Sequence, residues 1–196
     1  DNILTNIFQD YFGNVIKHIN ESIFIEFPSA TDATRCALAI QDKLKKFNAT
    51  SPKDFQINVG LGIHMAEVYE ENGDLFGDGI NLAARIKSVA GAEEILTTQA
   101  VYNSIRSEKD IFVKDIGRVV LKNIADPERI FKVYKNKTHY ESESLDGLIN
   151  NMKNRGVEFF DYKASQNKNT KVAMHYIENL GSEEDEFFCY GITDSI

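Results

Sequence analysis

The chain has 196 residues, enough for one ordinary domain with an appendage or for two small domains. Hydrophobic residues make up 42% of it and charged residues 27%, a balance that is typical of a folded globular protein and excludes a disordered one. The net charge of −8, without a cluster of Lys and Arg, argues against nucleic acid as a partner, because phosphate neutralisation needs a basic patch.

No apolar run approaches the roughly 20 residues that cross a bilayer, and the N-terminus has no signal-peptide pattern. The two cysteines, Cys36 and Cys189, have neither disulfide-framework nor metal-finger spacing. We therefore expect a cytoplasmic location and no transmembrane segment. The sequence has no initiator methionine and opens inside a helical pattern, so we expect the front of the domain to be missing.

The first 56 residues predict a helix, a hairpin and a second helix. Apolar residues at helical spacing over 3–11, followed by Gly13-Asn14, predict the first helix. Short apolar runs at 15–19 and 22–27 flank Asn20-Glu21 and predict a β-hairpin. Ser29, with Asp32 three residues later, predicts the start of a long helix that ends at residues 50–52.

From residue 57 to residue 65 the apolar pattern changes to a period of two, which predicts a strand. Gly60 and Gly62 share one face of it, a feature that marks close approach by another backbone or by a ligand. His64 lies on the same face, and we interpret it as a structural residue of the sheet. A turn is expected at residues 71–73.

Further strands are expected at residues 95–97, 111–122 and 130–134, with a short helix at 100–105. Because hairpins are mixed with strand–helix alternation, the class is α+β, with a largely antiparallel sheet and helices on one side. Residues 136–170 are expected to be a linker that contains a weak helix at 145–152. A strand at 171–177 would open a second domain.

The segment 73–86 contains an unusual polar stripe. Asp78 is the expected N-cap of a helix that runs to about Val89. Asn81, Arg85 and Ser88 lie at i, i+4 and i+7 on one face, between apolar or small residues. A poorly solvated guanidinium needs an anion. The pattern alone leaves two candidates open: a ligand phosphate or carboxylate, and an acid of the same domain.

Residues 73–85, GDLFGDGINLAAR, strongly resemble the substrate-binding signature of bacterial class III adenylate/guanylate cyclases. Three more blocks resemble that domain in the family's order: VIKHI at 15–19, GLGIH at 60–64 and LKNIADP at 121–127. The resemblance covers residues 1–135. It implies the ferredoxin-like class III cyclase fold, a mostly antiparallel sheet with helices packed on it, without its first strand and helix.

The resemblance implies conversion of ATP to 3′,5′-cyclic AMP and pyrophosphate by a homodimer whose site lies at the subunit interface. Asn81 and Arg85 match the pair that orients the ribose and stabilises charge on the α-phosphate. Lys122 matches a lysine that holds the terminal phosphates. Lys17 and Asp74 match the two base-reading positions, and a lysine with an aspartate there suits adenine better than guanine.

The family holds two Mg²⁺ or Mn²⁺ ions with two aspartates. The resemblance places the first aspartate before Asp1 and the second at Glu21, where this chain has Asn20-Glu21 in place of Gly-Asp. The extra methylene moves the carboxylate by about 1.5 Å, and a displacement near 1 Å can cost about a hundredfold in rate. Ala66 also replaces a glycine that is usual in the family. We therefore expect the chain alone to have low activity.

Three hypotheses follow. An active cyclase that tolerates the glutamate is favoured by the match at all five substrate positions. A degenerate cyclase-like domain that binds nucleotide, or only dimerises, is the alternative. A ferredoxin-like RNA-binding module shares the fold type, but the sequence lacks its aromatic and basic strand signature.

Residues 171–194 resemble the opening of a TolB-like amino-terminal domain, which follows the catalytic domain in many bacterial multidomain cyclases. Residues 171–196 would then be the truncated start of that domain. His175-Tyr176 stands where the family usually has Pro-Phe.

Overall fold

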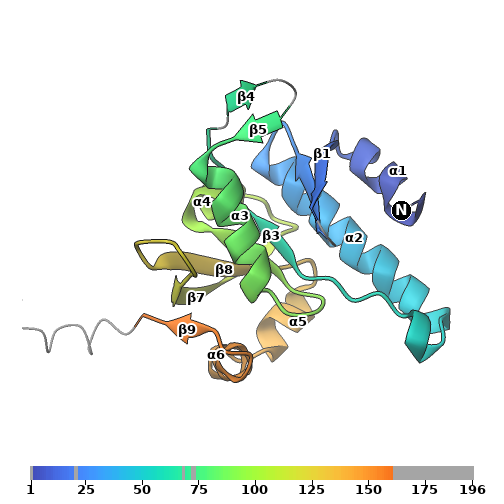
Figure 1. Cartoon of the computed structure of the whole chain (residues 1–196). Helices are drawn as coiled ribbons and strands as arrows, with labels where there is room; N and C mark the ends of the chain where they lie inside the picture. Colours follow the sequence, from blue (N-terminus) through green and yellow to red (C-terminus); the bar gives the residue numbers. More distant parts are fainter. Residues whose placement is uncertain (1, 20–21, 68, 72–73, 161–196) are drawn as a thin grey trace, which may run out of the picture. The chain divides into compact units, whose positions relative to one another are not determined.

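The computed structural model describes residues 2–19, 22–67, 69–71 and 74–160 (Figure 1). The hairpin tip Asn20-Glu21, residues 72–73 of the expected turn, the last ten residues of the expected linker and the expected TolB-like start lie outside the described residues. Residues 1–160 form one structural unit.

The elements have the following bounds. The helices are α1 (Asn2–Asp10), α2 (Ala30–Thr50), the 3-10 helix η1 (Lys53–Phe55), α3 (Asp78–Val89), α4 (Gln99–Ile105), α5 (Lys137–Ser142) and α6 (Leu145–Asn154). The strands are β1 (Asn14–Ile19), β2 (Ser22–Glu26), β3 (Leu61–Ile63), β4 (Tyr69–Glu71), β5 (Asp74–Phe76), β6 (Ile95–Thr98), β7 (Phe112–Val120), β8 (Glu128–Tyr134) and β9 (Glu158–Phe159).

A five-stranded sheet has the order β3-β6-β8-β7-β9. β3 pairs with β6 in parallel, and the other three pairings are antiparallel. Strands β1 and β2 form the predicted antiparallel hairpin, and β4 and β5 form a second one that was not predicted. The mostly antiparallel α+β architecture is therefore confirmed.

Helices cover both faces of this sheet, so the expectation of helices on one side was wrong. Neighbouring residues of a strand point to opposite faces. Leu96 of β6 belongs to a core cluster with α3 and α6, whereas Ile95 belongs to a cluster with α2 and α4. All four residues of β6 are buried, so both faces of this strand have to be covered.

Helix α2 begins and ends where the sequence predicts. Ser29 Oγ accepts a hydrogen bond of 3.0 Å from the Asp32 backbone N–H, which caps the helix. Ser51 is the C-cap, one residue before Pro52. The apolar stripe packs against α1 and the β1–β2 hairpin through a cluster that includes Cys36, whose thiol pKa burial raises to about 11.

The strand expected over residues 57–65 is limited to β3, Leu61–Ile63. Before it, Asn48 of α2 takes the place of a strand partner. Its Nδ2 donates to the Ile57 carbonyl at 2.8 Å, and the Ile57 N–H donates to its Oδ1 at 2.8 Å. A side chain thus satisfies the backbone of Ile57, and no ladder forms there.

Residues 137–160 are folded onto the sheet, so the expected linker is wrong up to residue 160. The helix predicted at 145–152 is confirmed as α6, and it buries Leu148 and Met152 in the cluster that contains Ile86 of α3. Strand β9 pairs with β7. The apolar residues of α6 form one helical stripe, and burying it against the sheet holds the segment in place.

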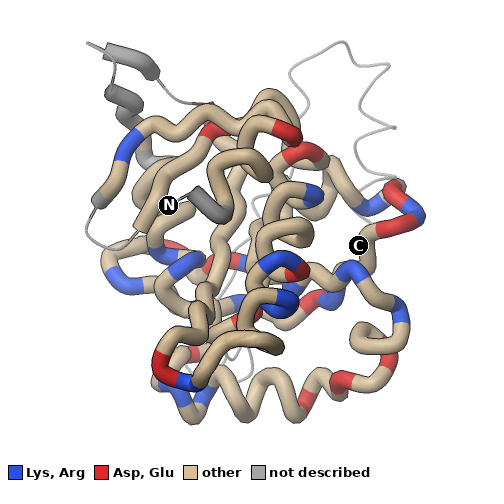
Figure 2. The backbone as a smooth tube through the Cα atoms, turned by 90° about the vertical axis from the view of Figure 1, so that its right-hand side faces the viewer, with Lys and Arg blue, Asp and Glu red and all other residues tan. Residues whose placement is uncertain are grey.

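Within the described segments, no helix combines the length and the hydropathy needed to span a membrane. Figure 2 shows acidic and basic residues interspersed along the described backbone.

Candidate functional site

Helix α3 carries the polar stripe, and its start is set by glycine. Gly77 is the N-cap, with φ at 144°, a backbone conformation that L side chains rarely adopt. Asp78 is therefore the first residue of the helix and not its cap, which corrects the prediction by one position. The predicted end at Val89 is confirmed.

Strand β3 and the segment before it lie in contact with α3. A Cβ on Gly62 would lie 2.4 Å from the backbone nitrogen of Lys87, and one on Gly60 would lie 2.8 Å from the carbonyl oxygen of Ala90. Of the two explanations open for these glycines, close approach by another backbone is confirmed. This contact sets the distance between α3 and strand β3.

Gly79, in the first turn of α3, faces the segment that follows β3. A Cβ on it would lie 2.3 Å from the Cβ of Ala66. Ala66 occupies the position where the family usually has glycine, so at this contact the glycine of α3 makes room for it.

The stripe itself is accessible. Asn81 is exposed and Arg85 is half-buried. Across the part of the chain that the structure describes, no acidic side chain forms an ion pair with Arg85. The Ser88 hydroxyl donates to the Arg85 carbonyl at 2.7 Å, so the helix itself uses this third member of the stripe. The hypothesis of a local acid as the partner of Arg85 receives no support.

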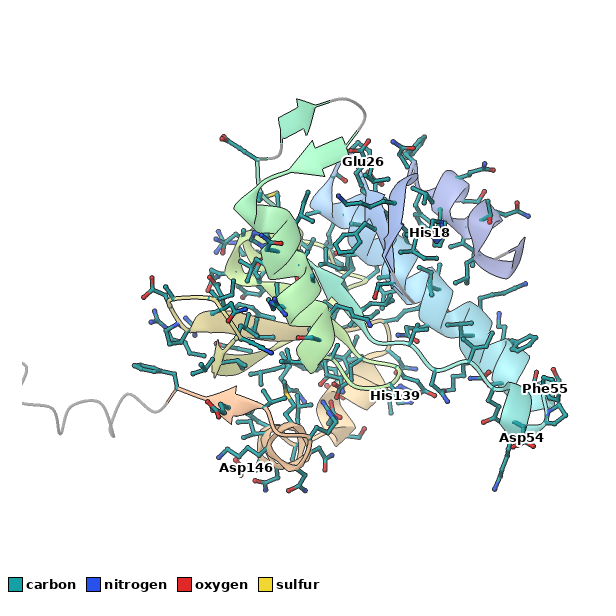
Figure 3. All side chains as sticks on the ribbon, in the orientation of Figure 1. His18, Glu26, Asp54, Phe55, His139 and Asp146 are labelled. Carbon is teal, nitrogen blue, oxygen red and sulfur yellow. The ribbon has the colours of Figure 1, made fainter. Side chains whose placement is uncertain are left out.

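A cavity of about 690 Å³ opens between the β1–β2 hairpin and the first half of α3. Its wall is mostly apolar and includes Phe24 and Ile80, and Lys17 of β1 contributes to it. Asn14 Nδ2 donates to Glu26 Oε1 at 2.9 Å where these two exposed residues line the cavity. Glu26 is labelled in Figure 3. The cavity therefore combines an apolar wall with one cationic side chain, Lys17, and one carboxylate, Glu26.

The predicted base-reading positions lie on neighbouring strands, because β1, with Lys17, contacts β5, which begins at Asp74. Helix α3 contributes Gly79, Ile80 and Ala83 to the cavity wall. At 3.6 residues per turn, Asn81 lies about 160° around the helix from Gly79 and Ala83, and about 100° from Ile80. The structure therefore brings Lys17 and β5 together, but it places the Asn81 side of α3 away from the cavity.

Lys122 is exposed and lies just past the end of β7, after Leu121. Leu121 is buried in the same cluster as Ile86, the residue after Arg85. The end of β7 and the Arg85 turn of α3 thus meet through a shared core. Glu21 lies outside the described residues.

The described residues do not supply a complete metal site. No group of three or more His, Cys, Asp or Glu side chains that could hold a metal ion occurs among them. The donor set present there does not by itself fit a divalent ion.

His64 is structural, as its position on the sheet predicts. Its Nδ1 lies 2.9 Å from Thr98 Oγ1 on β6. Burial lowers the pKa of His64 below its ordinary value of 6.5.

We expect this histidine to reduce stability in acid. Because the pKa of His64 is lowered in the folded state, the unfolded chain binds a proton at a higher pH than the folded chain does. The free energy of unfolding therefore decreases as the pH falls below 6.5. Denaturant titrations at several pH values should show a smaller loss of stability below pH 6.5 for His64→Gln than for the wild type. His139→Gln is the control for the substitution itself, because His139 is exposed on α5 (Figure 3). Identical profiles for His64→Gln and the wild type would contradict the prediction.

Sequence reasoning missed a cluster of charged side chains around Glu94. Glu94, buried just before β6, contacts Arg155 and Lys132. Glu143 contacts Lys132 at 3.0 Å, and its carboxylate also accepts a hydrogen bond from the Tyr134 hydroxyl. Burial and that hydrogen bond raise the pKa of Tyr134 well above its ordinary range. No local pattern in the sequence indicates these pairings.

Comparisons with known proteins agree with this architecture. Residues 24–140 match the model of the adenylate and guanylate cyclase catalytic domain. Over 119 residues the chain is 33% identical to a proposed adenylate cyclase, adenylate cyclase 3, of Rhizobium meliloti (strain 1021), an alignment that covers 61% of this chain and 20% of the relative. The chain thus spans about a fifth of that relative's length.

Two solved structures have the same fold. The adenylate/guanylate cyclase/hydrolase from Silicibacter pomeroyi aligns with a TM-score of 0.61 and 26% identity, over 66% of this chain and 77% of the other. An adenylate cyclase from Trypanosoma brucei in its monomeric state aligns with a TM-score of 0.57 and 21% identity, over 70% and 76%. Since the family model matches more than half of its residues, the chain belongs to the adenylate and guanylate cyclase catalytic-domain family.

Proposed function

We propose that this chain is the catalytic part of a cytoplasmic adenylate cyclase that converts ATP to 3′,5′-cyclic AMP and pyrophosphate in bacterial signal transduction. The half-buried Arg85, which has no acidic partner among the described residues, is the observation that carries the proposal. Asn81 would orient the ribose, and Arg85 would stabilise charge on the α-phosphate as the 3′-hydroxyl attacks it. Such phosphoryl chemistry depends on positioning and electrostatics.

Lys122 would hold the terminal phosphates, and its exposure beyond the end of β7 leaves its ammonium available to them. Lys17 and Asp74 would read adenine: the lysine donates to a ring nitrogen and the aspartate accepts from the 6-amino group. Guanine presents the opposite polarity, so ATP is preferred over GTP. The adjacency of β1 and β5, and the apolar cavity beside Lys17, support this assignment.

The active form would be a homodimer, because the Asn81 side of α3 is accessible and the family's site forms between two such domains. The family uses divalent metal ions, and Mg²⁺ or Mn²⁺ is proposed here. Glu21 would be one ligand, and an aspartate on a strand before Asp1 would be the other. The metal would neutralise charge on the phosphates. Residues 171–196 would begin a TolB-like domain.

Replacing Arg85 tests the proposal. In Mn²⁺ and ATP, the chain preceded by the strand that bears the expected first aspartate should form cyclic AMP. Arg85→Ala should lower kcat by at least about a hundredfold, since one group that stabilises the transition-state charge is lost. Lys87→Ala removes a cation from the exposed surface of the same helix and should change kcat less than about threefold. Equal losses in the two variants would contradict the role of Arg85.

The same assay separates the alternative, a degenerate domain that binds nucleotide or only dimerises. That alternative is favoured by Asn20-Glu21 in place of Gly-Asp. ATP binding by calorimetry without any product would support it and would reject the catalytic proposal.

A further inference from the structure

The segment after residue 140 lies outside the part of the chain that matches the family model, yet its helix α6 shares a buried core cluster with α3. Leu148 and Met152 of α6 are fully buried in one cluster with Ile86 of α3. In Figure 1 the lower end of α3 points toward α6, which is seen end-on. The helix with the proposed catalytic residues therefore shares its core with a helix beyond the matched domain.

An ion pair joins α6 to the end of α3. Arg155, the C-cap of α6, donates from Nη2 to Glu94 Oε2 at 2.7 Å. The same oxygen accepts the backbone N–H of Gly91 at 2.7 Å. Gly91 comes directly after Ala90, the C-cap of α3. One buried carboxylate oxygen thus holds the end of α3 and the end of α6 together.

Gly91 makes room for this arrangement. A Cβ on it would lie 2.8 Å from both Cζ and Nη1 of Arg155, and 3.0 Å from Glu94 Oε2. Its φ is not in the left-handed region, so the backbone itself would accept an alanine there. The packed guanidinium, and not the backbone conformation, is what a side chain at this position would displace.

We propose that Arg155 is a positioning residue for α3, an inference that rests on the function proposed above. Through Glu94 it fixes Gly91, two residues beyond Val89, and Val89 lies about 6 Å along the helix axis from Arg85. A displacement of α6 reaches the Arg85 turn through this ion pair and through the core cluster that Met152 and Ile86 share. A displacement of α6 would therefore alter catalysis without any contact between α6 and the nucleotide.

Arg155→Ala and Arg35→Ala form a matched pair of variants. Both arginine side chains are 38% exposed and both have a carboxylate oxygen at 2.7 Å. Arg35, on α2, pairs with Glu108 and, at 3.1 Å, with Asp110, neither of which belongs to α3 or to its end. In hydrogen exchange of the whole chain, Arg155→Ala should raise the exchange rate of α3 amides about tenfold relative to those of α2. Arg35→Ala should leave that ratio within about twofold of the wild type.

The second measurement is kinetic and uses the chain preceded by the strand that bears the expected first aspartate. Arg155→Ala should lower kcat about tenfold and change KM for ATP less than about twofold, because a misplaced Arg85 affects the transition state more than the bound substrate. Arg155→Lys, which keeps the positive charge, should recover most of the loss. Gly91→Ala, which keeps both charges but displaces the guanidinium, should reproduce it.

The outcomes are distinguishable. Unchanged exchange in α3, or an equal rise in α2 and α3, would overturn the positioning role, and so would a wild-type kcat in Arg155→Ala. If the wild type forms no cyclic AMP while Arg155→Ala still loosens α3 selectively, the proposed function fails and the structural coupling stands.

Discussion

Gly62→Ala is expected to lower the free energy of unfolding by about 3 kcal/mol. The added Cβ would lie 2.4 Å from the Lys87 nitrogen, 2.8 Å from its Cα and 2.9 Å from the Ala83 carbonyl oxygen. All three atoms belong to the backbone of α3, so no side-chain rotation relieves the contact. The helix has to move away from β3, and its core cluster loosens with it.

Chemical denaturation followed by circular dichroism measures this effect. Gly147→Ala, inside α6, is the matched control, because its Cβ meets only the Ser144 hydroxyl, at 2.9 Å. Alanine is also the better helix former, so we expect this control to change stability by less than about 1 kcal/mol. A Gly62→Ala variant as stable as the control would show that α3 does not rest on the glycine face of β3.

Elements with a local signal were predictable from the sequence. The cap at Ser29 predicted the start of α2, and the glycines at 60 and 62 predicted close approach by a backbone or a ligand, which the structure shows to be the backbone of α3. Asp78, a common N-cap residue, was wrongly placed because the positive φ of Gly77 is not visible in a residue pattern. The predicted strand began too early, at residue 57, because the side chain of Asn48 on α2 binds the backbone of Ile57 in place of a neighbouring strand.

The boundary of the folded unit was not predictable, because its evidence is non-local. The polar residues 136–144 have the composition of a linker, and the apolar stripe of α6 indicates a helix without indicating its partner. The core that it joins contains residues of β7 and Ile86 of α3, which come earlier in the chain. The same distinction applies to the candidate site. The signature at residues 73–85 predicted α3 and its polar stripe, whereas the ion pair of Glu94 with Arg155 joins two residues far apart in the sequence and belongs to no motif.

Glu94→Ala is expected to cost about 2 to 3 kcal/mol of unfolding free energy, less than the loss from a fully buried ion pair because the Arg155 side chain is 38% exposed. Arg155 loses the carboxylate at 2.7 Å, and the Gly91 N–H loses its acceptor. Lys132 loses its ion pair with Glu94 but keeps the one with Glu143 at 3.0 Å. Glu94→Gln keeps the shape and one oxygen that can accept from Arg155 and Gly91, but it replaces the oxygen that accepts from Lys132 with an NH2 group. It should therefore cost about half as much.

Asp42→Ala provides the comparison with an exposed ion pair. Asp42 pairs with Lys135, and their side chains are 43% and 58% exposed. Exposed pairs contribute about 0–1 kcal/mol, so this variant should unfold at nearly the denaturant concentration of the wild type. If Glu94→Ala and Asp42→Ala lower stability equally, the carboxylate of Glu94 does not hold the two helix ends together, and α6 is attached to α3 by apolar packing alone.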